Sequence, residues 1–221
     1  MKQKSITYNN IIFFSIFIVV ALCFLLHDKF FQYEDDKGVV SEFLRTCNYS
    51  DSRHIIASDN ARKIIRQKSD TAIKAIKFRN FTLIEKLIHP KFGIRFSPYI
   101  YVMSSDIVFS AENFETRYND DYIYDWGSKR MSKNMRMTFK DYYSTYIYQN
   151  DYAISQDVTY NQTFPIDNIV DNTYNFYPEA IVVEYNSDNL GDYSKSLLRL
   201  VFEKYKNEYF LSGIITINDK L

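Results

Sequence analysis

Two long apolar runs near the C-terminal end constrain the fold more than any other part of this sequence. They are SLLRLVFEKY at 196–205 and EYFLSGIITI at 208–217, and only Lys206 and Asn207 separate them. β-Branched and aromatic residues are frequent in both runs, and so short a connection joins neighbouring antiparallel strands. The pair therefore predicts a β-hairpin, and AIVVEY at 180–185 predicts another strand.

The segment from residue 59 to residue 88 has a helical pattern instead. Asp59 is placed to cap a helix that extends to residue 80. A second helix is predicted at 81–88, where Thr82 and Glu85 match a capping box. The apolar stripe of the first helix consists of Ile65, Ala72, Ile73, Ile76 and Phe78. Helices followed by antiparallel strands predict an α+β fold.

Shorter elements are predicted between these helices and the hairpin. Alternating apolar residues from Ile94 onward and the run at 107–110 predict strands, and Ser110 is placed to cap a short helix. Thr138 and Asp141 match a second capping box. That box predicts the start of a tyrosine-rich helix with the sequence FKDYYSTYIY.

The stretch HPKFGIRFSPYIYV, residues 89–102, has two interpretations. His89 and Arg95 can be a charge-handling pair, or the stretch can turn the chain from a helix into a sheet. We favour the second, because Pro90 ends a helix, Gly93 permits a tight turn and Pro98 marks a bend or a sheet edge. In that interpretation a partial positive charge on His89 is favourable at the helix C-terminus, and Arg95 projects from an edge strand.

The N-terminal segment predicts where the protein resides. Residues 1–10 carry Lys2 and Lys4 and no acid, and IIFFSIFIVVALCFLL at 11–26 carries no charge. We predict a cytoplasmic tail at 1–10, a single transmembrane anchor at 11–27 and a stalk with a short helix at 28–58. Residues 59–221 are then expected to form an extracytoplasmic domain.

Two alternatives to an uncleaved anchor stay open. A cleaved signal peptide lacks a small-x-small cleavage site after Leu26. A lipoprotein would be lipidated at Cys23, but Leu22 stands where a small residue is usual. Cys47 is the one other cysteine, so an anchored domain has no disulfide framework.

The amino-acid composition limits which classes of partner are expected. The chain has 27 basic and 27 acidic residues, so no basic excess attracts nucleic acid. Its 20 tyrosines and 18 phenylalanines are expected from an AT-rich genome and are not by themselves a sign of ligand binding.

Two helices packed into a bent antiparallel sheet with a long final hairpin resemble the NTF2-like α+β cone. Three segments also resemble secreted or surface-anchored proteins of Gram-positive bacteria: LIHPKFGIRFSPYIYV, DIVFSAENF and LRLVFEKYKNEYFLSGIITI. The similarity covers residues 70–217, while the ending ITINDKL and the absence of the usual lipidation cysteine depart from that group. The resemblance implies a fold and a location, and no catalytic residues.

The loop NDDYIYDWGS at 119–128 is a candidate binding segment. Its Asp120, Asp121, Asp125 and Trp126 are residue types that bind Ca²⁺ or a sugar. The spacing does not match a calcium loop, however, since the alternating ligands and the distal Glu are missing. Trp126 can equally fill the core.

We interpret three methionines and one pair of opposite charges as structural features. Met131, Met135 and Met137 raise the possibility of copper, yet without a nearby Cys or His we predict packing, and no metal or cofactor. Glu184 and Arg199 lie on predicted neighbouring strands, and we expect a cross-strand ion pair on a solvent-exposed face.

These observations predict a non-catalytic domain. We expect a small or closed pocket and recognition of an envelope component or protein partner by an aromatic surface. The residues predicted for this surface are Tyr122, Trp126, Tyr142, Tyr143 and Tyr146. The alternative is an assembly component of a secretion or sporulation complex, and a small isomerase or hydratase is the third hypothesis.

Overall fold

The computed structural model describes residues 55–127, 135–163, 170–188 and 195–218. The chain divides into two units, Met1–Asp51 and Ser52–Leu221, and the description concerns the second. The predicted tail and anchor, and the predicted stalk up to residue 54, lie outside these residues. Among the residues that are described, no helix has the length and apolar character needed to span a bilayer.

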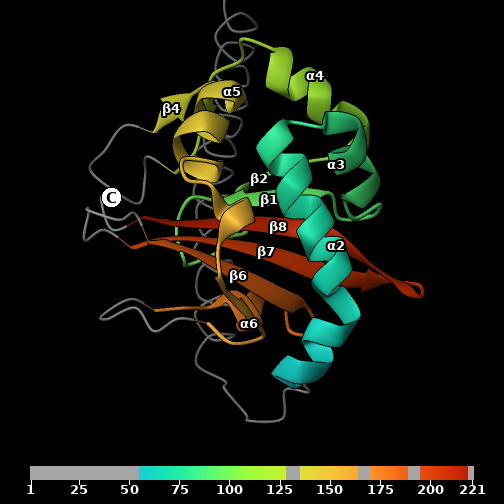
Figure 1. Ribbon diagram of the computed structural model, residues 1–221. Helices are drawn as coiled ribbons and strands as arrows, with labels where there is room; N and C mark the ends of the chain where they lie inside the picture. Colours follow the sequence, from blue (N-terminus) through green and yellow to red (C-terminus); the bar gives the residue numbers. More distant parts are fainter. Residues whose placement is uncertain (1–54, 128–134, 164–169, 189–194, 219–221) are drawn as a thin grey trace, which may run out of the picture. The chain divides into compact units, whose positions relative to one another are not determined.

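A six-stranded sheet forms the centre of the domain, in the order β2-β1-β8-β7-β6-β5 (Figure 1). All neighbouring strands are antiparallel except β1 and β8, which are parallel. The bounds are β1 Ile94–Ser97, β2 Ile107–Phe109, β5 Asp157–Tyr160, β6 Ile181–Asp188, β7 Lys195–Tyr205 and β8 Glu208–Asn218. The α+β prediction is confirmed.

The predicted final hairpin is also confirmed. β7 and β8 pair from Tyr205 opposite Glu208 along their length, with a bulge between Val201 and Phe202. Lys206 begins the turn in a left-handed conformation, with φ of 55°. Such a φ suits the turns that join hairpin strands tightly.

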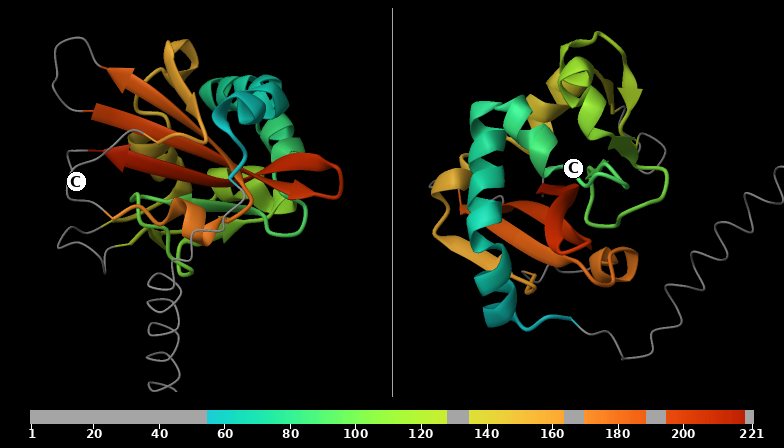
Figure 2. Two further views of the ribbon diagram at one scale, coloured as in Figure 1. Left: turned by 90° about the horizontal axis from the view of Figure 1, so that it is seen from below. Right: turned by 90° about the vertical axis from the view of Figure 1, so that its right-hand side faces the viewer.

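Helices lie on both faces of this sheet, as the views in Figure 2 show. The long α2 and the short α3 and α5 cover one face, and α6 lies on the opposite face. A small ribbon of β3 and β4 stands apart from the main sheet. The remaining bounds are α2 Ser58–Phe78, α3 Phe81–Leu87, η1 Ala111–Asn113, α4 Phe114–Asn119, β3 Tyr124–Asp125, β4 Arg136–Met137, α5 Phe139–Tyr142, η2 Tyr143–Ile147, η3 Tyr152–Ile154 and α6 Thr173–Phe176.

Strand alternation gives the domain two cores. In β7, Leu198 and Leu200 belong to the core that packs on α2, whereas Leu197 and Val201 belong to a second core. The second core is covered by Ile100 and Val102 of the loop after β1 and by Tyr177 and Ala180 after α6. Both faces of the central strands are therefore buried.

Several predicted helix ends are wrong by a few residues. α2 begins at Ser58 after Ala57, so Asp59 lies in its first turn instead of capping it, and Phe78 is 73% exposed. α3 is capped by Asn80, whose side chain accepts a hydrogen bond from the N–H of Leu83, and Thr82 is not the cap. Ser110 is at the N-cap position of η1, as predicted, but its side chain makes no cap hydrogen bond.

The capping prediction at Thr138 is confirmed. Its hydroxyl oxygen accepts a hydrogen bond from the N–H of Asp141 at 3.1 Å. It also donates to the Asp141 carboxylate at 2.8 Å. The predicted tyrosine-rich helix then begins as α5 and continues into the wider turn of η2.

The stretch 89–102 turns the chain from α3 into β1, as expected. The carbonyl of His89 accepts a hydrogen bond from the N–H of Gly93, whose φ is 69°. Two details of the prediction are wrong. β1 is an interior strand, so Arg95 does not lie on a sheet edge. Burial lowers the pKa of His89, which disfavours the expected positive charge.

Candidate functional site

The side chain of Arg95 in β1 stabilises the loop between β1 and β2, residues 98–106. Its guanidinium Nη1 donates to the carbonyl oxygens of Met103, Ser104 and Asp106 at 3.0, 2.9 and 2.9 Å. One cation thus binds three carbonyl groups of the same loop. This arrangement orders a segment that has no regular secondary structure of its own.

Asp106 and Asn172 complete this support. Asp106 is buried, and its Oδ2 accepts hydrogen bonds from Ser97 Oγ at 2.6 Å and from the N–H of Met103 at 2.9 Å. The Asn172 side chain bonds both backbone groups of Val102, accepting at 2.7 Å and donating at 2.8 Å. The loop is therefore joined to β1 and to the segment that leads into α6.

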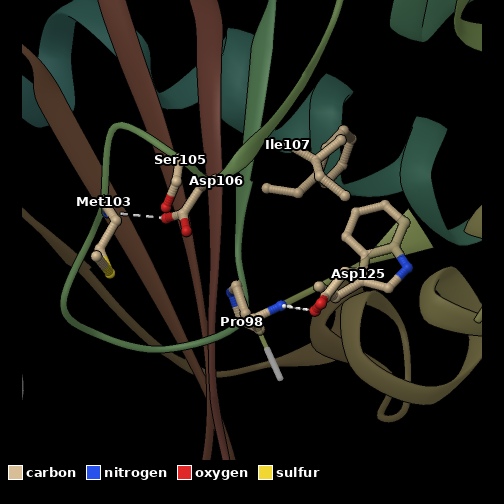
Figure 3. A pocket seen from close by; sticks show the side chains of 9 residues that line it. Pro98, Met103, Ser105, Asp106, Ile107 and Asp125 are labelled. Atoms are coloured by element: carbon tan, nitrogen blue, oxygen red, sulfur yellow. Dashed lines mark hydrogen bonds between the residues drawn. The ribbon is translucent and has the colours of Figure 1, made fainter. Parts of the chain in front are cut away.

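A hollow of about 270 Å³ lies between this loop and the end of β3 (Figure 3). In the close-up, Met103, Ser105 and Asp106 come from the loop, and Asp125 lies across from them. Asp125 accepts a hydrogen bond from the N–H of Gly127 at 3.1 Å. The nine lining residues are Phe96, Pro98, Met103, Ser105, Asp106, Ile107, Asp125, Trp126 and Gly127.

Trp126 anchors the β3 side of the hollow. Its indole Nε1–H donates to the carbonyl of Met137 at 3.0 Å, and its ring stacks on Tyr142 with centroids 3.8 Å apart. Only 2% of the residue is exposed. Trp126 therefore forms part of the wall while most of its ring belongs to the core.

The five aromatic residues predicted to form a recognition surface lie in two different environments, one exposed and one buried. Tyr122 is 62% exposed, and its ring meets that of Tyr124 edge-on. Trp126, Tyr142, Tyr143 and Tyr146 are all buried in the core instead. The expectation of a shared exposed aromatic surface is thus wrong for these four.

The reason is that the tyrosine-rich segment packs inward. The hydroxyl of Tyr143 donates to the carbonyl of Ile76 in α2 at 2.6 Å. Tyr146 stacks against Tyr142, with ring centroids 5.3 Å apart. Burial raises the pKa of both Tyr143 and Tyr146 above the ordinary tyrosine value. These side chains fill volume between the helices and the sheet.

The acidic loop has no metal-binding geometry among its described residues. Asp120 pairs with Arg117 at 3.5 Å and accepts a hydrogen bond from the N–H of Tyr122. Within the described ranges no cluster of three or more His, Cys, Asp or Glu side chains can hold a metal. Met135 is buried, Met137 is half-buried, and Met131 lies outside those ranges.

A second polar site, which was predicted to lie in solvent, is buried on the α6 face of the sheet. Glu184 and Arg199 are opposite each other on β6 and β7, as expected, but both side chains are 0% exposed. Arg199 Nε donates to Glu184, while Nη1 donates to Asp171 at 2.6 Å and to the Thr173 hydroxyl at 3.0 Å. The ion pair is thus a buried network that ties α6 to the sheet.

Tyr174 adds an unsatisfied group beside this network. Burial raises the pKa of its hydroxyl, and the Arg199 charge opposes that shift. The Tyr174 hydroxyl and Arg199 Nη2 are buried without a hydrogen-bond partner among the described residues. Both alternating sets of side chains in the final strand are mainly apolar, which predicts that both faces of the sheet are covered, as observed. The alternation of β7 places Arg199 with Leu197 and Val201 on one of these buried faces.

The comparisons with known proteins gave no match: no family model, no curated protein and no solved structure matches this chain.

Proposed function

We propose that this chain is a membrane-anchored extracytoplasmic domain that binds an envelope component or a protein partner without catalysing a reaction. The hollow between the 98–106 loop and β3 is the contact site in this proposal. The observation that carries it is the way the loop is built. Arg95, Asp106 and Asn172 together hold an irregular segment in one shape beside a recess, and its Ser104 and Ser105 are exposed.

The size and lining of the hollow support recognition of a small part of a larger partner. Pockets that enclose a whole small molecule are usually about 300–1,000 Å³. At about 270 Å³ this hollow is slightly smaller and suits one side chain or a single small group. Apolar walls from Pro98 and Ile107 combine with the exposed carboxylate of Asp125, so the hollow can select a group that has both an apolar and a polar part.

The domain itself is proposed to be an NTF2-like cone. Support comes from helices that cover one face of a mostly antiparallel sheet and from the long hairpin of β7 and β8. Membrane attachment is proposed from the uncharged run at 11–26 and from Lys2 and Lys4 before it.

Protease treatment of protoplasts tests the proposed topology. With tags at both ends of the chain, added protease should remove the C-terminal tag and the domain after residue 58, while the N-terminal tag stays protected. The reason is that lysines before an apolar span retain that end in the cytoplasm. Protoplasts permeabilised with detergent are the control, in which both tags must be digested. A protected C-terminal tag in intact protoplasts would contradict the topology.

Site-specific photocrosslinking in producing cells tests the binding site. A photoreactive phenylalanine analogue at Ser105, on the exposed rim of the hollow, should form a defined adduct, while the analogue at Gln67, exposed on α2, should not. Adding Asp125→Lys should lower the adduct at position 105 about tenfold, equivalent to ~1.4 kcal/mol of binding. Equal adducts from both positions, or no effect of Asp125→Lys, would show that the hollow is not the contact site.

A further inference from the structure

His89 occupies a closed environment in the turn between α3 and β1. The residue is 1% exposed, and its ring stacks on Phe92 with centroids 4.6 Å apart. The rings of Tyr205 and Phe210, from β7 and β8, meet it edge-on at 5.5 and 6.2 Å. Three aromatic rings from the turn and from the hairpin thus surround one imidazole.

The hydrogen bonds determine which form of the imidazole fits. Nδ1 accepts hydrogen bonds from the backbone N–H groups of Lys91 at 3.2 Å and Phe92 at 2.9 Å. A nitrogen that accepts carries no proton, so the ring is neutral and its hydrogen is on Nε2. Nε2 is buried with no hydrogen-bond partner among the described residues. An N–H at this position can point only at the face of a neighbouring ring, where the contact available is weak.

A second proton is incompatible with this geometry. It would place an N–H on Nδ1, directly against two backbone N–H donors, and a positive charge on a residue that is almost inaccessible to water. The charged groups nearby do not compensate, because most of them are also positive. Lys91 is in the turn, Lys68 of α2 lies 4.9 Å from the Phe210 ring and Lys206 lies 5.4 Å from the Tyr205 ring.

The two acids on this part of the hairpin do not compensate either. Glu203 of β7 is opposite Phe210, and burial raises the pKa of its carboxyl, which favours the neutral form. Glu208 of β8 pairs with Lys68 at 3.5 Å, and its side chain is 69% exposed. Lys68 also donates to the carbonyl of Tyr209 at 2.6 Å. The surroundings thus agree with the lowered pKa of His89, whose main cause is burial.

We propose that His89 is an acid-sensitive switch that releases the 89–93 turn from the β7–β8 hairpin when it gains a proton. The turn is fastened to β8 by the hydrogen bond from the N–H of His89 to the carbonyl of Leu211, at 3.0 Å. It leads directly into β1, where Arg95 supports the loop beside the hollow. Release of the turn therefore loosens the first strand of the binding site. This inference concerns the turn itself and holds whether or not the hollow binds a partner.

The direction of the pH effect follows from the two states of His89. With the turn open, the imidazole has its ordinary pKa of about 6.5. With the turn closed, the pKa is lower, so the open form binds more protons between these two values. The turn is then fully stable above pH ~6.5 and loses stability as the pH falls toward the pKa of the closed form.

Hydrogen–deuterium exchange of the full chain in detergent micelles between pH 7.5 and 5 tests the switch. After correction for intrinsic exchange rates, opening of residues 89–97 should increase about tenfold per pH unit below pH 6.5 until the pKa of the closed form is reached. Trp126, the sole tryptophan, gives a second readout at the hollow through its fluorescence. Opening that is independent of pH in this range would overturn the proposal.

Two variants separate His89 from the other titrating groups. His89→Asn keeps a side-chain oxygen that can accept the N–H bonds of the turn but cannot titrate, so its opening should not depend on pH in this range. His54→Asn, which changes another of the three histidines, should keep the wild-type pH dependence. If His89→Asn does not fold, an NMR titration of the wild-type imidazole decides instead. A His89 pKa at or above 6.5 would refute the proposal.

Discussion

Replacing Arg199 by methionine should lower the free energy of unfolding by about 3–5 kcal/mol. The Arg199 side chain is completely buried and is paired with Glu184, which is also completely buried. Without the guanidinium, the buried Glu184 carboxylate loses its cationic partner between the sheet and the segment around α6. Asp171 and Thr173 lose the donor that holds that segment against β7.

Urea unfolding of the full chain in detergent micelles, followed by Trp126 fluorescence, measures this loss. The matched control is the double variant Arg199→Met with Glu184→Leu, which removes the buried carboxylate together with its cationic partner. Because buried ion pairs are often replaceable by apolar side chains at little cost, the double variant should be more stable than the single one. A single variant that loses less than about 1 kcal/mol would mean that water reaches Glu184 and that this face is not closed.

Replacing Gly93 by alanine should destabilise the domain by roughly 3 kcal/mol or more, through two effects of the same Cβ atom. The φ of 69° is a left-handed conformation, which alone costs a residue with a Cβ about 1–2 kcal/mol. The added Cβ would also lie 2.4 Å from the carbonyl oxygen of Phe109. That oxygen belongs to β2, so relief of the clash requires β2 to move away from β1.

Lys206→Gly is the matched control for this prediction. Lys206 also has a positive φ, 55°, but it lies in an exposed hairpin turn. Glycine relieves the strain there, so the change in unfolding free energy should be small or favourable, within about 1 kcal/mol. The same urea titration serves for both variants. Equal stability of Gly93→Ala and the wild type would show that the turn and β2 shift at little cost.

Local pattern was enough to determine much of this domain. The two apolar runs separated by Lys206 and Asn207 can pair only with each other at so short a distance, and they form β7 and β8. Gly93 and Thr138 were assigned correctly, because a left-handed turn and a helix cap depend on a few neighbouring residues. The short strands β3, β4 and β5 and the single turn of α6 were not predicted, since so few residues show no clear period.

Burial, by contrast, was decided by tertiary structure. The tyrosine-rich segment has the composition of an exposed aromatic surface, yet Tyr142 stacks on Trp126 and Tyr143 bonds α2. Arg199 is of a residue type that usually lies in solvent, and it is buried because the chain from Asp171 to Ala180 covers that face of the sheet. Sequence alone determined the long helix α2 and the long strands β7 and β8, because hydrogen bonding and period are local. Which side chains those elements enclose depends on contacts between residues far apart in the chain, and only the folded structure sets these.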